Sequence, residues 1–187
     1  MTGKIGRDFS DRAACSETSG DGMALISSRR RSLSEDSEHV AGFFLEPLGL
    51  YLLVERRDGL IRKIRFSARR PKHTVPPDEE EALLGCWLKG EPVPFELDFS
   101  GLTEFQREVF EVTSRIPLGE TMTYGQLADK IGRPNAARAV GQAMGKNPFP
   151  LIIPCHRVVG SKGIGGYSSG VELKRKVLDI EREICQK

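Results

Sequence analysis

The sequence predicts an α+β fold in which an antiparallel sheet with one helix is followed by a mainly helical part that contains a helix-turn-helix. Two observations predict it. Short apolar runs separated by a turn signal fill the first half after residue 40, and helical apolar stripes that begin at capping signals fill the second half. We expect residues 1–40 to be a disordered tail, residues 41–100 to form an N-terminal α/β domain, and residues 101–187 to form a C-terminal domain.

Composition limits the class of protein. The chain has 187 residues, 39% of them hydrophobic, which is enough to bury one sizeable core or two small ones. No run approaches the roughly 20 apolar residues of a membrane span, and the N-terminus lacks the apolar core of a signal peptide, so we expect an intracellular protein. The net charge of +2 is compatible with DNA contact without arguing for it.

The first forty residues are rich in Ser, Gly, Asp and Arg and carry no sustained apolar period, which is typical of disorder. They hold six Lys or Arg and seven Asp or Glu, so the rest of the chain carries +3. The arginine triplet at residues 29–31 fits a kinase or targeting signal as well as a solvated tail.

The next segment predicts a sheet and a helix. Residues 49–54 and 60–66 form apolar runs on either side of Asp58-Gly59, a pair that favours a tight hairpin turn. Residues 77–90 predict a helix with acidic residues in its first turn and a terminal glycine. Its buried face would carry Leu83, Leu84, Trp87 and Leu88. Residues 92–101 are expected to be a linker.

The second half begins two helices with capping boxes. Thr103 and Gln106 precede an apolar stripe at residues 105, 109, 112 and 116, and Thr123 and Gln126 open a shorter helix that Gly132 ends. After a turn at residues 133–135, residues 136–145 predict a third helix. Helix, short turn and helix is the spacing of a helix-turn-helix.

The helix at residues 136–145 is unusual for a reader of bases, because it is mostly Ala and Gly, with Arg138 and Gln142 as its polar members. Small residues at Ala136, Ala137 and Gly141 allow close approach. They fit tight packing against the core as well as contact with the narrow minor groove of DNA.

Cys155 is a candidate nucleophile. A free cysteine with a pKa of about 8.5 needs a base or a positive field to react, and His156 and Arg157 are the local candidates. In an extended segment, neighbouring side chains point to opposite faces, so direct contact of His156 with the sulfur requires a bend, which Pro154 favours, or a bridging water. A core cysteine and half of a zinc site are the alternatives. The four cysteines show no pair spacing and the histidines show no ligand spacing, so we predict free thiols and no metal.

Glu181 is a candidate partner for His156. The helix from residue 172 to about 184 has its apolar residues at 173, 177, 180 and 184, which places Glu181 at the inward edge. A carboxylate there needs a buried hydrogen-bond partner, unless it is partly exposed. The glycine-rich residues 160–166 do not follow the phosphate-binding Walker pattern, and we expect a mobile loop over the cysteine, with Tyr167, Ser168 and Ser169 near the same cavity.

A family resemblance rests on these residues. The run at residues 147–159, NPFPLIIPCHRVV, together with Tyr124 and residues 136–141 before it and residues 166–168 after it, resembles the O6-alkylguanine-DNA alkyltransferases, or methylated-DNA--protein-cysteine methyltransferases. The resemblance is close over residues 102–183 and only general over residues 43–100. It implies a ribonuclease-H-like N-terminal domain and direct reversal of DNA alkylation by single-turnover transfer to Cys155, with no cofactor.

The resemblance also implies the site residues. Cys155 would attack the alkyl carbon, His156 would take the thiol proton through a water, Glu181 would orient His156, and Asn147 would link the helix-turn-helix to the site. The DNA-binding residues would be Arg138, which enters the base stack, with Tyr124, Ala136, Ala137, Gly141 and Ser161. The substrate-binding residues would be Tyr124, Met144, Cys155, Val158, Tyr167 and Ser168.

The implied partner is double-stranded DNA that contains O6-alkylguanine, bound by a monomer in the cytoplasm, or in the nucleus of a eukaryote, with no membrane involved. The sequence departs from the family in three places. It has no ligand set for the structural zinc of some members, and Ser169-Gly170 stands where relatives have paired glycines. The long N-terminal tail has no counterpart in the family.

Three other functions fit parts of the pattern. An alkyltransferase-like protein binds the lesion but replaces the cysteine, and Cys155 is present here. A helix-turn-helix regulator would carry a merely structural cysteine. A cysteine hydrolase would need an oxyanion hole and would turn over many substrates.

Overall fold

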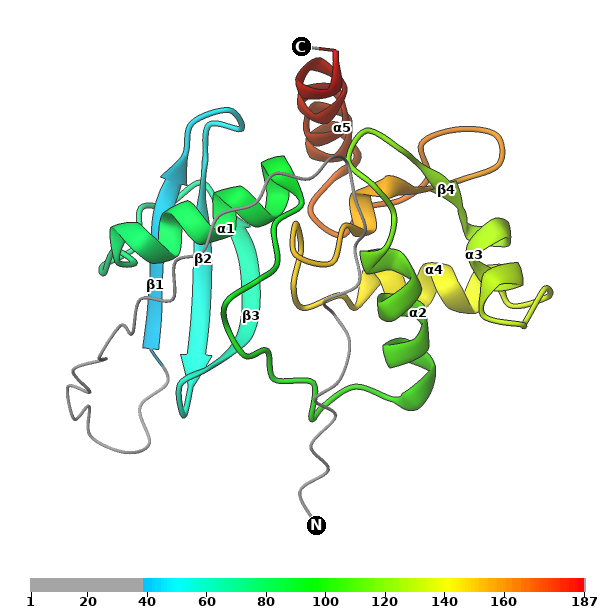
Figure 1. Ribbon diagram of the computed structural model, residues 1–187, viewed down its shortest axis with the longest axis horizontal. Coiled ribbons are helices and arrows are strands. Elements are labelled where there is room, and N and C mark those ends of the chain that lie inside the picture. The colour runs from blue at the N-terminus through cyan, green and yellow to red at the C-terminus, as the bar shows by residue number, and fades with distance from the viewer. Residues whose placement is uncertain (1–38, 187) are drawn as a thin grey trace, which may run out of the picture. The chain divides into compact units, whose positions relative to one another are not determined.

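The computed structural model describes residues 39–186, which lie in one compact unit (Figure 1). It is a mixed α/β structure with a small antiparallel sheet, as predicted. In chain order the elements are β1 (His39–Leu45), β2 (Leu50–Arg57), β3 (Leu60–Ser67), α1 (Pro77–Lys89), α2 (Glu104–Ser114), β4 (Met122–Thr123), α3 (Tyr124–Lys130), α4 (Ala137–Gly145), the 3₁₀ turn η1 (Cys155–Arg157), β5 (Val158–Val159) and α5 (Val171–Cys185).

The predicted tail lies outside the described residues, except at its end. Residues 39 and 40 belong to β1, so the prediction that disorder extends to residue 40 is wrong there. His39 pairs with Arg56 and Val40 with Glu55, because β2 is long enough to continue the ladder beyond the apolar run.

The three strands form the predicted meander in the order β1-β2-β3. Asp58 and Gly59 both have positive φ angles, 52° and 79°, which is the backbone of the tight hairpin turn that Asp-Gly favours. Residues of the three strands such as Phe43, Leu52 and Ile64 are buried and belong to the core. Helix α1 crosses the sheet (Figure 1).

The segment at residues 92–101 is more than a linker. Leu97 forms a parallel bridge with Ile61, where the Ile61 amide donates to the Glu96 carbonyl at 3.0 Å and the Asp98 amide donates to the Ile61 carbonyl at 2.8 Å. The open edge of β3 supplies unpaired backbone groups, and this segment satisfies some of them.

Both predicted capping boxes are present, at Thr103 with Gln106 and at Thr123 with Gln126. Gly132, with φ 71°, follows the end of α3 and reverses the chain toward α4. Helix α2 ends at Ser114, so Ile116 lies beyond the helix, although it is buried as the apolar stripe predicted.

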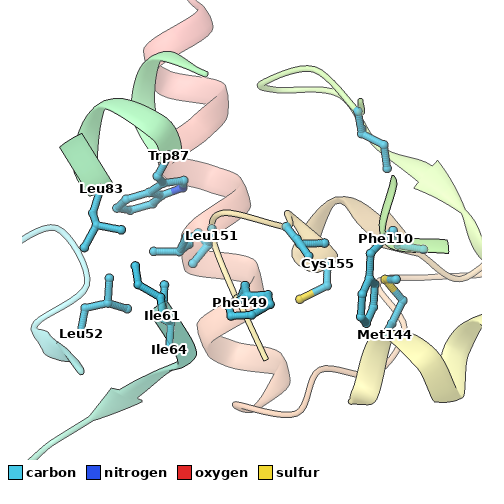
Figure 2. Close-up of a cluster of buried hydrophobic side chains, with 14 of the residues drawn as sticks. Leu52, Ile61, Ile64, Leu83, Trp87, Phe110, Met144, Phe149, Leu151 and Cys155 are labelled. Atoms are coloured by element: carbon cyan, nitrogen blue, oxygen red, sulfur yellow. The ribbon is translucent and has the colours of Figure 1, made fainter. Parts of the chain in front are cut away.

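A hydrophobic core joins the sheet to the C-terminal helices. Figure 2 shows it extending from Leu52 on β2 through Trp87 on α1 and Phe149 to Met144 on α4. Cys155 is part of this cluster. No helix among residues 39–186 is long and apolar enough to cross a membrane.

Candidate active site

Cys155 lies on a turn and not on an extended strand. Residues 155–157 form one turn of 3₁₀ helix after Pro154, and the Arg157 amide donates to the Pro154 carbonyl at 2.9 Å. The side chains of Cys155 and His156 therefore do not follow the alternation of an extended strand, because the chain bends after Pro154, which was the alternative that the sequence left open. The left-handed φ of 73° at Leu151 is unfavourable for a leucine and marks a constrained approach to the cysteine.

The carboxylate of Glu181 is the centre of the buried polar network. His156 Nε2 lies 2.7 Å from Oε1, and Arg157 donates through one Nη to Oε1 at 2.8 Å and through Nε to Oε2 at 2.9 Å. The indole of Trp87 donates to Oε1 at 3.1 Å. The predicted pairing of Glu181 with His156 is confirmed, and Glu181 is fully buried rather than partly exposed.

The charges in this network determine the proton positions. Burial alone would raise the pKa of Glu181, but hydrogen bonds from His156 and Arg157 and the positive charge of Arg157 lower it to about 2, so the group is a carboxylate. Burial lowers the pKa of His156 despite the opposing effect of Glu181, so the imidazole is neutral. A neutral His156 that donates from Nε2 to the carboxylate leaves a lone pair on Nδ1, which is buried and has no hydrogen-bond partner within the described residues.

The thiol of Cys155 is 5% exposed, and burial raises its pKa. Asn147, the positive charge of Lys174 and Tyr167 act in the opposite direction but do not outweigh burial. The resting group is therefore a neutral thiol that needs a base to become a nucleophile.

Lys174 belongs to the site, although the sequence did not single it out. Its ammonium is fully buried on α5 and donates to the carbonyls of Val158 at 2.6 Å and Gly166 at 3.1 Å. Burial lowers its pKa to about 8, against the opposing effect of Cys155. The sequence does contain a signal for a buried Lys174, because this residue lies three positions before Val177, next to the apolar stripe of the last helix.

Asn147 connects the end of α4 to the segment before the cysteine. Its Nδ2 donates to the Ile153 carbonyl at 2.8 Å, and its Oδ1 accepts from the Phe149 amide at 3.0 Å. These two hydrogen bonds hold the loop that carries Cys155 in place. Met144, one turn earlier, is buried in the same core.

The glycine-rich segment and two tyrosines lie around the cysteine. Tyr124 Oη donates to the Gly166 carbonyl at 3.4 Å, and a methyl group added at Gly165 would lie 3.0 Å from the Tyr124 ring. Tyr167 lies beside the thiol, and burial raises its pKa well above the ordinary value. Ser161 and Ser168 are exposed.

Helix α4 has an exposed outer face and a buried inner face. Arg138 is exposed, whereas Val140, Ala143 and Met144 turn inward. Ala136, Ala137 and Gly141 are half-buried, so small residues serve close packing here, and Gly141 lies against the Tyr124 ring. Across residues 39–186 there is no group of three His, Cys, Asp or Glu side chains that could hold a metal ion.

We predict that Glu181 stabilises the folded protein at neutral pH and that this stabilisation is lost in acid. Its pKa falls from an ordinary 4.5 to about 2 on folding, so its stabilisation is present above about pH 4.5 and is lost as the pH falls toward 2. Urea unfolding should show that the wild type loses about 2 kcal/mol more than Glu181→Gln between about pH 5 and about pH 3. The exposed neighbour change Glu183→Gln should leave the wild-type pH dependence intact, and an equal pH dependence in Glu181→Gln and wild type would contradict the assignment.

Comparison with known proteins identifies the family. A family model described as "6-O-methylguanine DNA methyltransferase, DNA binding domain" matches residues 104–183. A methylated-DNA--protein-cysteine methyltransferase of Mycolicibacterium paratuberculosis is 40% identical over 147 residues, which cover 73% of this chain and 88% of the relative. The corresponding protein of Methanosarcina acetivorans is 38% identical over 149 residues, which cover 74% and 95%.

Solved structures agree with the sequence comparison. The Mycobacterium tuberculosis OGT in complex with DNA matches with a TM-score of 0.64 and 36% identity over 78% of this chain and 94% of that one. The O6-methylguanine-DNA methyltransferase of Pyrococcus kodakaraensis matches with a TM-score of 0.64 and 30% identity over 76% and 97%. On this evidence, the chain belongs to the methylated-DNA--protein-cysteine methyltransferase family.

Proposed function

We propose that this protein repairs DNA by transferring the alkyl group of O6-alkylguanine to the Sγ of Cys155. The observation that carries the proposal is a buried thiol followed in the chain by a neutral histidine, which Glu181 holds with its Nδ1 free of protein partners in the described chain. The family membership supports the same reaction, since the relatives are named for cysteine methyl transfer from methylated DNA.

The transfer balances as a simple displacement. The thiol proton passes to Nδ1 of His156 through a water, and the sulfur forms a bond to the alkyl carbon while the carbon–O6 bond breaks. The electron pair stays on guanine, which takes a proton from the Tyr124 hydroxyl. The resulting thioether has a poor leaving group, so water does not regenerate the thiol and each chain acts once.

Access to the thiol requires an extruded base. The sulfur is buried and the O6 substituent is inside a duplex, so neither can reach the other without base flipping. We assign α3 and α4 as the helix-turn-helix, with the small residues Ala136, Ala137 and Gly141 against the minor groove and Ser161 on the adjacent loop. Exposed Arg138 would fill the gap left in the base stack.

The flipped guanine would lie among the groups that surround Cys155. The backbone of Cys155 and Val158 would read its edge, and Met144, Tyr167 and Ser168 would line the pocket. The Val158 carbonyl accepts from Lys174, and a carbonyl oxygen has a second lone pair that would accept a bond from a base amine. Asn147 would keep the cysteine loop in register with α4.

The same proposal includes the division into domains, the oligomeric state and the location of the protein. We assign a ribonuclease-H-like N-terminal domain over residues 41–100 and a C-terminal alkyltransferase domain over residues 101–187. The protein would act as a monomer on double-stranded DNA, in the cytoplasm or in a eukaryotic nucleus.

The nucleophile is tested by intact mass. After incubation with duplex DNA that contains O6-methylguanine, the wild type should gain one methyl group, located on Cys155, and Cys155→Ala should gain none while still binding DNA. Continued turnover without a mass gain would indicate a hydrolase. An unchanged mass with the lesion bound and intact would indicate a lesion-binding protein.

The extrusion role of Arg138 is tested with two substrates. Arg138→Ala should slow transfer from duplex DNA by at least about tenfold and leave transfer from free O6-benzylguanine nearly unchanged, because the free base needs no extrusion. Arg138→Lys provides the control that keeps the positive charge. Equal losses of rate on both substrates would contradict the extrusion role.

A further inference from the structure

The Glu181 carboxylate receives a hydrogen bond from outside the C-terminal part of the chain. Trp87 on α1 donates from Nε1 to Oε1 across 94 residues of sequence. Both side chains are fully buried, and the indole lies between α1 and α5 in Figure 2. The same oxygen accepts from His156 at 2.7 Å and from Arg157 at 2.8 Å.

The Trp87 indole is an uncharged donor to Glu181, whereas Arg157 is a cation. Arg157 stabilises the carboxylate but, as a cation, also lowers the pKa of His156, as does Lys174 on α5. The indole N–H is neutral, so it stabilises the carboxylate without adding a positive charge near the imidazole. A buried N–H that donates to an anion is a strong hydrogen bond, and leaving it unmade is costly.

The contact also limits the movement of the carboxylate. Arg157 binds both oxygens and fixes the plane of the group, while Trp87 approaches Oε1 from α1. The direction of Oε1 sets the direction of the imidazole that donates to it. Packing alone would account for a buried aromatic side chain on α1, but not for the placement of its only polar atom on this oxygen.

We propose that Trp87 is a positioning residue for alkyl transfer, which acts through Glu181 on His156 and so makes α1 part of the reacting assembly. The inference rests on the proposed function. Trp87 touches neither the thiol nor the imidazole in any contact described above, and its effect passes through one carboxylate oxygen.

Trp87→Phe removes the N–H and keeps an aromatic ring. In single-turnover transfer from a single-stranded oligonucleotide that contains O6-methylguanine, the rate at saturation should fall about tenfold, whereas the half-saturating DNA concentration should not change. With one donor fewer, Oε1 attracts the protonated imidazole more strongly. The acid side of the pH–rate profile should therefore move to higher pH.

Leu83→Val is the matched control, because Leu83 is a buried residue of the same face of α1, one turn earlier. It should lower the thermal unfolding midpoint but leave the rate of the folded protein and its pH profile as in the wild type. If Trp87→Phe fails to fold, replacement of Trp87 by β-(3-benzothienyl)alanine, in which sulfur replaces the N–H at nearly constant shape, should give the same slower rate and shifted profile.

The outcomes separate the two proposals. A wild type that transfers normally, with a Trp87 variant that matches it in both rate and pH profile, overturns the role of Trp87 alone. A wild type that never becomes alkylated overturns the proposed function and this inference with it. A slower rate with an unshifted profile, matched by Leu83→Val, would reduce Trp87 to a packing residue.

Discussion

The buried carboxylate of Glu181 is the interaction on which the rest of the site depends. An ionised carboxylate inside a protein is stable only when its oxygens are fully bonded, and here His156, Arg157 and Trp87 supply the donors. These bonds join α5 to the turn that carries Cys155 and to α1. The Glu181 carboxylate pairs with the buried charge of Arg157. The same carboxylate accepts from His156 Nε2 and so determines that the proton of the imidazole lies on that nitrogen.

This arrangement explains how a buried cysteine can react without being a thiolate at rest. Burial keeps the thiol neutral and also keeps His156 neutral, so the two groups are matched as acid and base. Lys174 and Asn147 favour the anion once it forms. A thiol that ionises only when a base is positioned beside it is protected from unselective reactions, which suits a chain that can react once.

Local sequence signals predicted most of the fold. The Asp58-Gly59 turn, the two capping boxes and the glycine that ends α1 appear in the structure because each depends on neighbouring residues only. The edge pairing of Leu97 with Ile61 was missed, since it joins distant segments and leaves no periodic pattern. The start of β1 was also misplaced, because its first residues are held by pairing and not by burial.

The candidate site was predicted less evenly, for the same reason. His156 and Glu181 could be paired from helical geometry and the cost of burying a carboxylate. The fork of Arg157 on Glu181 depends on the 3₁₀ turn, and the bond from Trp87 depends on the packing of α1 against α5, so neither could be derived from spacing. The roles proposed for Arg138 and Tyr124 rest on family resemblance, because an exposed arginine on a helix has no local signature of function.

The proton positions on His156 are the most direct test of this account. The chain has three histidines, so the nitrogen-15 resonances of His156 can be assigned by comparison with His156→Gln. At neutral pH, Nε2 should be protonated and Nδ1 unprotonated in the unreacted protein. Two protonated nitrogens, or a proton on Nδ1 with none on Nε2, would contradict it, because His156 could then not accept the proton of Cys155.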